Sequence, residues 1–286
     1  MLPPFDLCEP QSLADALQAL SKHSDARPLA GATNLVPDLR DKRETCRNFI
    51  SLEALDELRY IKRDGGRVTL GARTTIADIL DDDGMKTDAP ALYASAQIFG
   101  GAMVRTAATI GGNICCGSPS ADSVPPLLTL DADVTLSSAC GERTVPIDEF
   151  YVDYKKTVMR SDEMLTSVSW NVPPQGSANL FYKLARRKGD AITVTGVAVM
   201  IAVQGGVCST ARIALGSVGP TIFRAGAAED MLMGKALSED IIEQAAKAAA
   251  DRCSPIDDIR AGAGYRLQTA HSLTRRLVTQ AWQQIA

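Results

Sequence analysis

Histidine is almost absent from this chain, which has only His23 and His271 among its 286 residues. Neither lies near a glycine-rich segment, which argues against a histidine-based catalytic or metal site. The seven cysteines are scattered without a C-x-x-C spacing, so we expect neither a disulfide framework nor a zinc or iron–sulfur site. An acid–base pair and a nucleophile with a partner base are also lacking, and we therefore predict no catalytic residues and no metal ligands.

The chain has no block of basic residues and no long apolar run. Its 30 Lys and Arg against 34 Asp and Glu give a formal net charge of −4, which excludes the electrostatic pattern of nucleic-acid or anionic-membrane binding. No segment reaches the roughly 18 apolar residues of a membrane span, and the N-terminus lacks a signal-peptide pattern. We expect a cytoplasmic protein without nucleic-acid or membrane partners and, from its length, two domains.

Short helices and strands are mixed along the first 171 residues. Ser12 predicts a helix cap before residues 13–23, and residues 27–30 read as a strand. The turn Asp64-Gly65-Gly66 predicts a hairpin, and residues 164–170 form a further strand. The Pro/Gly-rich segment 173–176 is typical of a domain boundary. We therefore predict a first domain over 1–175, with subdomains of about 1–55 and 56–175, and a second over 176–286.

The last third of the chain has its own pattern. Apolar residues alternate through 181–184, 197–203 and 208–215, which predicts an antiparallel meander. Amphipathic helices follow, one capped by Ser238 and one over about 270–285. Strands followed by helices indicate an α+β domain with its helices on one face of an antiparallel sheet.

Two segments rich in Gly, Thr and Asn follow extended stretches, about eighty residues apart. The first is Gly31-Ala32-Thr33-Asn34, and the second, residues 109–122, contains Gly111-Gly112. Glycines let backbone approach a ligand, and hydroxyl and amide side chains supply hydrogen-bond donors. Each segment alone is more typical of an ordinary turn than of a ligand site. Facing each other, the two could hold a pyrophosphate between their backbone amides, without the G-x-G-x-x-G or Walker A pattern.

Four segments in register resemble a known family. They are Ala30-Gly31-Ala32-Thr33-Asn34-Leu35, Thr109-Ile110-Gly111-Gly112-Asn113-Ile114, Ser118-Pro119-Ser120-Ala121-Asp122 and Phe181-Tyr182-Lys183-Leu184-Ala185-Arg186-Arg187. Their order and spacing closely resemble the FAD-binding medium subunit of molybdenum hydroxylases, the xanthine dehydrogenase and carbon monoxide dehydrogenase family. The resemblance covers essentially the whole chain. It implies an α+β fold, in which a two-subdomain FAD-binding domain of the p-cresol methylhydroxylase type precedes a C-terminal α+β domain.

The resemblance also implies a set of cofactor-binding residues. The first loop would wrap the pyrophosphate from one side, and the second would hold it and the ribityl chain from the other. Asp122 would accept a hydrogen bond from a flavin sugar hydroxyl, and Lys183 would stabilise reduced, anionic flavin. The implied set is Pro28, Leu29, Ala30, Gly31, Ala32, Thr33, Asn34, Leu35, Phe99, Val104, Ala108, Thr109, Gly112, Asn113, Cys115, Asp122, Leu165 and Lys183.

Several of these residues have a plainer alternative. Asp122 could cap the following helix, and Lys183 could be a solvated edge residue. Phe99, Val104 and Leu165 could simply be core, because lining a cofactor differs little from packing in a core.

The chain departs from the family pattern at two places. Ala32 stands where the family usually has glycine, so the first loop must tolerate a methyl group there. Cys115 and Cys116 stand where small or aliphatic residues are common. A redox role for these thiols is not favoured, because nothing basic lies near them in sequence to lower their pKa.

The function implied by the resemblance is that of an FAD-binding electron-transfer subunit. Its partners would be a molybdopterin-binding large subunit and a small subunit with two [2Fe-2S] clusters, in a heterotrimer or a dimer of heterotrimers. Electrons would pass from the clusters through FAD to an external acceptor: NAD, oxygen, a quinone or a ferredoxin. A self-contained FAD-dependent oxidase of a small molecule is the first alternative, and a scaffold that has lost its cofactor is the second.

Overall fold

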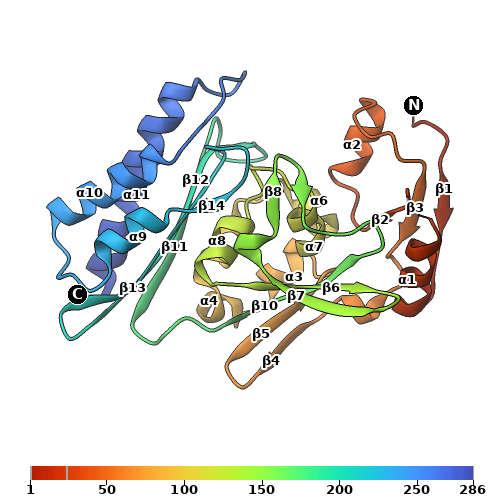
Figure 1. The fold of residues 1–286 in the computed structure, drawn as a ribbon, viewed down its shortest axis with the longest axis horizontal. Helices are drawn as coiled ribbons and strands as arrows, with labels where there is room; N and C mark the ends of the chain where they lie inside the picture. Colours follow the sequence, from red (N-terminus) through yellow and green to blue (C-terminus); the bar gives the residue numbers. More distant parts are fainter. Residues whose placement is uncertain (1, 24, 286) are drawn as a thin grey trace.

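The computed structural model describes residues 2–23 and 25–285 and divides into three parts along its long axis (Figure 1). The N-terminal lobe is a three-stranded parallel sheet in the order β1-β3-β2. Its elements are β1 (Asp6–Cys8), α1 (Leu13–Lys22), β2 (Arg27–Leu29), α2 (Leu35–Arg40) and β3 (Asn48–Ser51). As predicted, the Ser12 hydroxyl caps α1 by accepting a hydrogen bond from the Asp15 amide. Leu20 and Ile50 pack together beneath this sheet.

The central domain is built on a five-stranded antiparallel sheet in the order β4-β5-β10-β6-β7. Its strands are β4 (Ile61–Asp64), β5 (Arg67–Gly71), β6 (Asp133–Ser138), β7 (Gly141–Pro146) and β10 (Met164–Asn171). The predicted hairpin joins β4 to β5. Trp170 is fully buried in β10, and its indole nitrogen donates to the Asp88 carbonyl at 3.0 Å.

Short helices cover the central sheet. They are α3 (Ile76–Asp81), α4 (Met85–Asp88), α5 (Pro90–Gln97), α6 (Ala102–Ala107), α7 (Ile110–Cys115) and α8 (Val124–Thr129). Two 3₁₀ turns, Asp56–Leu58 and Ile147–Glu149, and a small hairpin of β8 (Tyr151–Asp153) and β9 (Lys156–Thr157) complete the domain. The second glycine segment is therefore not an open loop as expected, because Thr109 caps a helical turn there.

The C-terminal domain confirms the expected antiparallel meander followed by helices. Its sheet has the order β11-β12-β13-β14, with strands β11 (Ser177–Ala185), β12 (Thr193–Gln204), β13 (Val207–Gly216) and β14 (Phe223–Arg224). The helices α9 (Gly226–Leu232), α10 (Glu239–Asp251) and α11 (Ala263–Ile285) lie on its outer face (Figure 1). They bury a core that includes Ile213, Ala245 and Leu277.

The inner face of the C-terminal sheet packs against the central domain. Ala198 and Met200 of β12 belong to the same hydrophobic cluster as the central sheet. The buried Asn179 amide in β11 joins the two parts, because it accepts from the Ala91 amide at 3.1 Å and donates to the Thr129 hydroxyl at 3.0 Å. The two domains therefore share one continuous interface.

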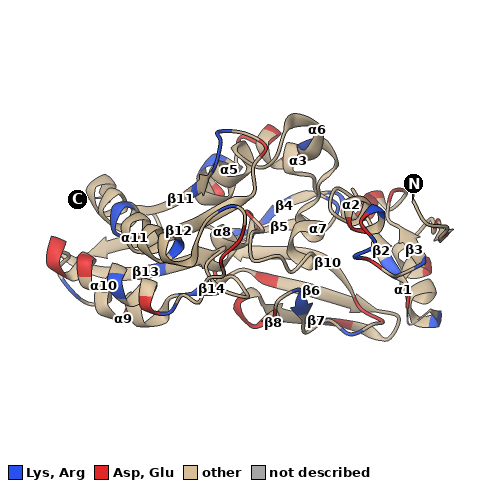
Figure 2. Ribbon diagram, turned by 90° about the horizontal axis from the view of Figure 1, so that it is seen from above, with Lys and Arg blue, Asp and Glu red and all other residues tan. Residues whose placement is uncertain are grey.

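Charged residues of both signs are scattered over the molecule in Figure 2. No helix within the described ranges is both long and apolar enough to span a lipid bilayer.

Candidate cofactor-binding site

A cavity of about 580 Å³ lies where the N-terminal lobe, helices α6 and α7, and the connection between β11 and β12 meet. This volume is in the range of small-molecule and cofactor sites. Its walls come from segments far apart in sequence: the β2–α2 connection, residues 99–122, Lys183, and residues 190–192 at the end of the β11–β12 connection. The two glycine segments therefore lie on one cavity.

Every residue of the implied cofactor-binding set lines this cavity except Leu165. Leu165 is in β10, where it pairs with Leu136 of β6 and packs in the central hydrophobic core. Phe99 and Val104 line the cavity and also pack against that core, so each is both a core residue and a cavity-lining residue.

The first glycine segment is held against the end of α6. A Cβ atom on Gly31 would lie 1.6 Å from the Ala107 carbonyl oxygen, so only glycine permits this approach. Ala32 adopts a left-handed φ of 55°, which explains why glycine suits this position. Within the described residues, none of the backbone N–H groups of residues 31–34 donates to another protein atom. They remain available to an anion.

The backbone amides at the start of α7, in the second segment, already have hydrogen-bond acceptors within the protein. Ile110 and Gly111 donate to the carbonyls of Thr74 and Ala72 at 2.9 and 3.0 Å, which ties the start of α7 to the strand-to-helix turn after β5. The Gly112 amide donates to the Thr109 hydroxyl at 3.1 Å. The two segments are therefore not equivalent, because residues 31–34 present free backbone donors, whereas residues 110–113 use theirs within the protein.

Side chains supply what the second segment can offer a ligand. The Asn113 carbonyl oxygen accepts from the amide and the hydroxyl of Ser123, which leaves the Asn113 NH₂ group free to donate. The Thr109 hydroxyl accepts from Gly112 and retains its own proton to donate. Asn34 of the first segment donates to Cys116 Sγ at 3.1 Å, so the two segments touch directly.

Asp122 and Lys183 form a buried ion pair at the cavity wall. Lys183 Nζ lies 2.6 Å from Asp122 Oδ2, with side chains only 6% and 9% exposed. Thr193 Oγ1 donates to the other carboxylate oxygen. Burial raises the pKa of Asp122, while Lys183 and Thr193 oppose that rise. Neither plainer alternative holds, since Asp122 makes no cap to α8 and Lys183 is not solvated.

Ionic residues at the N-terminal end of the cavity were not foreseen from the sequence. Arg27 forms an ion pair with Glu44. Asp38 forms ion pairs with both Arg43 and Lys155, each at an N–O distance of 3.3 Å. Burial raises the pKa of Glu44, but the Cys46 and Thr45 amides and Arg27 together outweigh it, so the pKa lies below its usual value. No local pattern reveals these pairs, because Lys155 and Asp38 are 117 positions apart.

The adjacent thiols Cys115 and Cys116 both line the cavity, and burial raises the pKa of each. For Cys115 the pKa rises to about 12, so on the order of 10⁻⁴ of this thiol is ionised near pH 8. Their environment therefore provides no activated thiolate, because burial outweighs the nearby charges of Arg27 and Lys155.

We expect Cys115 to resist alkylation in the folded protein. With iodoacetamide near pH 8, the exposed Cys8 and Cys140 should be labelled first, and Cys115 only on unfolding, because the thiolate is the reacting species. Mass spectrometry of peptides over a time course measures this order. Equal labelling rates for Cys115 and Cys140 would contradict it.

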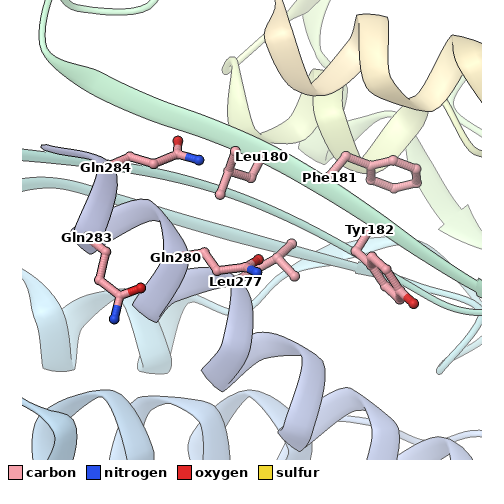
Figure 3. Close-up of a pocket in the computed structure, with 7 residues that line it drawn as sticks. All are labelled: Leu180, Phe181, Tyr182, Leu277, Gln280, Gln283 and Gln284. Carbon is pink, nitrogen blue, oxygen red and sulfur yellow. The ribbon is translucent and has the colours of Figure 1, made fainter.

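A second cavity of about 320 Å³ lies between β11 and α11 (Figure 3). None of the implied cofactor-binding residues lines it, and its lining offers no titratable acid–base pair. Its walls are formed by Leu180, Phe181, Tyr182, Leu277, Gln280, Gln283 and Gln284.

The fold and the larger cavity define a two-domain protein that binds a nucleotide cofactor. Comparison with known proteins identifies the family to which it belongs. Residues 3–174 match the family described as the FAD binding domain in molybdopterin dehydrogenase. Residues 180–281 match the CO dehydrogenase flavoprotein C-terminal domain. The chain belongs to the family of FAD-binding medium subunits of molybdenum hydroxylases, which are oxidoreductases.

Individual relatives match over nearly their whole length. The carbon monoxide dehydrogenase medium chain of Hydrogenophaga pseudoflava is 32% identical over 100% of both chains. The xanthine dehydrogenase FAD-binding subunit of Escherichia coli O157:H7 is 32% identical over 94% of this chain and 93% of its own. The solved structure of H. pseudoflava carbon monoxide dehydrogenase lacking the Mo-pyranopterin moiety superposes with a TM-score of 0.96, at 32% identity and 100% coverage of both chains.

A relative with a different substrate has the same fold. Quinoline 2-oxidoreductase from Pseudomonas putida 86 superposes with a TM-score of 0.91 at 30% identity, covering 99% of this chain and 98% of its own. Because relatives named for carbon monoxide, xanthine and quinoline are all similar to this chain, the fold does not select a substrate.

Proposed function

We propose that this chain is the electron-transfer subunit of a molybdenum-containing hydroxylase, holding FAD in the larger cavity. Electrons from the [2Fe-2S] clusters of a small partner subunit would reach an external acceptor through this cofactor, whose isoalloxazine ring supplies the redox chemistry. A molybdopterin-binding large subunit would complete a cytoplasmic heterotrimer or dimer of heterotrimers. The proposed domains are 1–175 and 176–286, supported by family matches that end at 174 and begin at 180.

The observation that carries the proposal is the run of free backbone amides at residues 31–34. Consecutive N–H groups beside a left-handed residue form a concave anion site, which suits the pyrophosphate of a dinucleotide. Thr109 and Asn113 offer two further donors from the opposite segment. The donor set and the cavity volume therefore fit FAD, with the diphosphate bound mainly by the first segment.

At the other end of the site, the chain's contribution is electrostatic. Lys183 places a cation at the cavity wall, and such a charge stabilises reduced, anionic flavin. The Asp122 carboxylate has about four acceptor positions, of which Lys183 and Thr193 use two. The remaining positions can accept a sugar hydroxyl, as the resemblance implies.

The test of cofactor binding is a titration of the purified, flavin-free chain with FAD, FMN and riboflavin, followed by flavin fluorescence. Because the free amides recognise the diphosphate, FAD should bind at least about tenfold more tightly than riboflavin, which lacks phosphate. Equal affinity for all three flavins would overturn the proposed diphosphate site.

Reduction of the bound flavin separates the proposal from its main alternative. A self-contained oxidase would let a small organic substrate bleach the flavin of the isolated chain. An electron-transfer subunit would require the partner chains for that reduction. Copurification from the native host, followed by molybdenum and iron analysis, identifies those chains, and rapid bleaching of the isolated chain by the holoenzyme's substrate would favour the oxidase.

A further inference from the structure

We propose that Thr193 is a positioning residue for the flavin site, holding the Asp122 carboxylate so that Lys183 keeps its place at the cavity wall. This inference rests on the proposed binding of FAD in the larger cavity. Thr193 is 3% exposed and does not line the cavity, so it contacts the Asp122 carboxylate on the side away from the cavity.

The three side chains come from two domains. Asp122 follows α7 in the central domain, while Lys183 and Thr193 belong to β11 and β12 of the C-terminal domain. Lys183 donates to Oδ2 of Asp122 and Thr193 donates to Oδ1, so each carboxylate oxygen has one donor from the neighbouring domain. Two donors on different oxygens restrict rotation of the carboxylate, which a single ion pair would not do.

A β-bulge between β11 and β12 places the Thr193 side chain on the same face of the sheet as Lys183. Lys183 pairs with Gly196 and Leu184 with Thr195, but Ala185 then pairs with Thr193 instead of residue 194. Paired residues share a face of a sheet, and faces alternate along each strand. In a regular ladder Thr193 would therefore point away from the face of Lys183, whereas the β-bulge turns it to the same face.

Val194, the extra residue of this bulge, is hydrogen-bonded by a buried arginine of the C-terminal domain. Arg266, which is 3% exposed, donates to the carbonyls of Val194 and Ser217 at 2.6 and 2.9 Å. It also pairs with Asp258 at 2.9 Å. A buried guanidinium that satisfies the bulge carbonyl keeps the register shift in place, and with it the direction of the Thr193 hydroxyl.

The test replaces Thr193 in the full chain and measures FAD affinity and the flavin midpoint potential. Thr193→Val removes the hydroxyl at nearly constant volume and leaves Asp122 Oδ1 without its donor. We expect FAD to bind about 5- to 30-fold more weakly, and the midpoint potential to become more negative as the Lys183 charge loses its position. Thr193→Ser keeps the hydroxyl and should restore both quantities to near the parent values.

Thr195→Val is the matched control, because it makes the same change two residues along β12. Thr195 is fully buried, and its hydroxyl lies 2.8 Å from that of Thr269, away from the cavity lining. We expect it to lower thermal stability without moving the midpoint potential. If Thr195→Val shifts the potential as much as Thr193→Val, the role of Thr193 is merely structural and the inference fails.

The outcomes also separate this inference from the proposed function. A parent chain that binds no FAD would overturn the proposed function itself. A parent chain that binds FAD, with Thr193→Val unchanged in affinity and potential, would overturn only the positioning role. Should Thr193→Val not fold, Thr193→Ala and Thr193→Ser form the comparison, and equal potentials in these two would refute the inference.

Discussion

Gly31→Ala is expected to lower the free energy of unfolding by about 3 kcal/mol and to abolish tight FAD binding. The new Cβ would lie 1.6 Å from the Ala107 carbonyl oxygen and 2.4 Å from its carbon. Because the obstacle is backbone, no rotamer change can relieve it, and the loop must move away from α6. In calorimetry this loss corresponds to a fall in Tm of about 6–12 °C.

Two other substitutions isolate the cause of this effect. A Cβ on Gly226, at the start of α9, would meet open space, so Gly226→Ala should leave Tm nearly unchanged. Ala32→Gly removes a left-handed strain of about 1 kcal/mol and adds a comparable entropy to the unfolded chain, so its net effect should stay below about 1 kcal/mol. If Gly31→Ala has the same Tm as the parent chain, the loop does not need the close approach of Gly31 to the Ala107 carbonyl.

Local sequence patterns predicted much of this fold because they act over a few residues. The Ser12 cap, the hairpin at Gly65-Gly66 and the strand expected over residues 197–203 each depend on neighbours in the chain, and all appear in the structure. The lining of the cavity followed from the resemblance rather than from these patterns. Leu165 shows the limit, because an apolar residue on a central strand gives no sign of which apolar surroundings it will meet.

The features that escaped prediction depend on contacts between distant segments. A shift of one residue between β11 and β12 decides which face Thr193 occupies, and no composition change marks it. The Arg27–Glu44 and Lys155–Asp38 pairs need the N-terminal lobe and the β8–β9 hairpin to be in place first. Likewise, the glycines of the second segment suggested an open amide loop, but Gly111 donates to Ala72 in the turn after β5 and Gly112 donates to the Thr109 hydroxyl.

Lys183→Met should destabilise the chain strongly. It leaves the buried Asp122 carboxylate without a cation, and breaking a buried pair in this way costs about 3–5 kcal/mol near neutral pH. Urea unfolding measures the cost. As a control, Arg59→Met breaks an exposed pair with Asp78, whose arginine side chain is 52% exposed, and should cost at most about 1 kcal/mol.

The cost of Lys183→Met should depend on pH in a definite direction. Burial raises the pKa of Asp122, and removing Lys183 removes the main influence that opposes this rise. A carboxyl whose folded pKa lies above its unfolded value of about 3.9 favours folding below that value, and this stabilisation is lost as pH rises through the folded pKa. The deficit of the variant should therefore be small near pH 4 and larger near pH 8; a deficit independent of pH would contradict a charged Asp122 as its cause.

A second substitution at Asp122 shows whether the loss comes from the unpaired charge. Asp122→Asn alone leaves the Lys183 ammonium buried without a carboxylate, so it should also destabilise the chain. The double variant Asp122→Asn/Lys183→Met has no charged side chain at these two positions. We expect it to be more stable than either single variant, with a coupling energy of about 2–3 kcal/mol. Since Asp122 and Lys183 lie on different domains, this coupling measures how strongly the ion pair joins the C-terminal sheet to the wall of the FAD cavity.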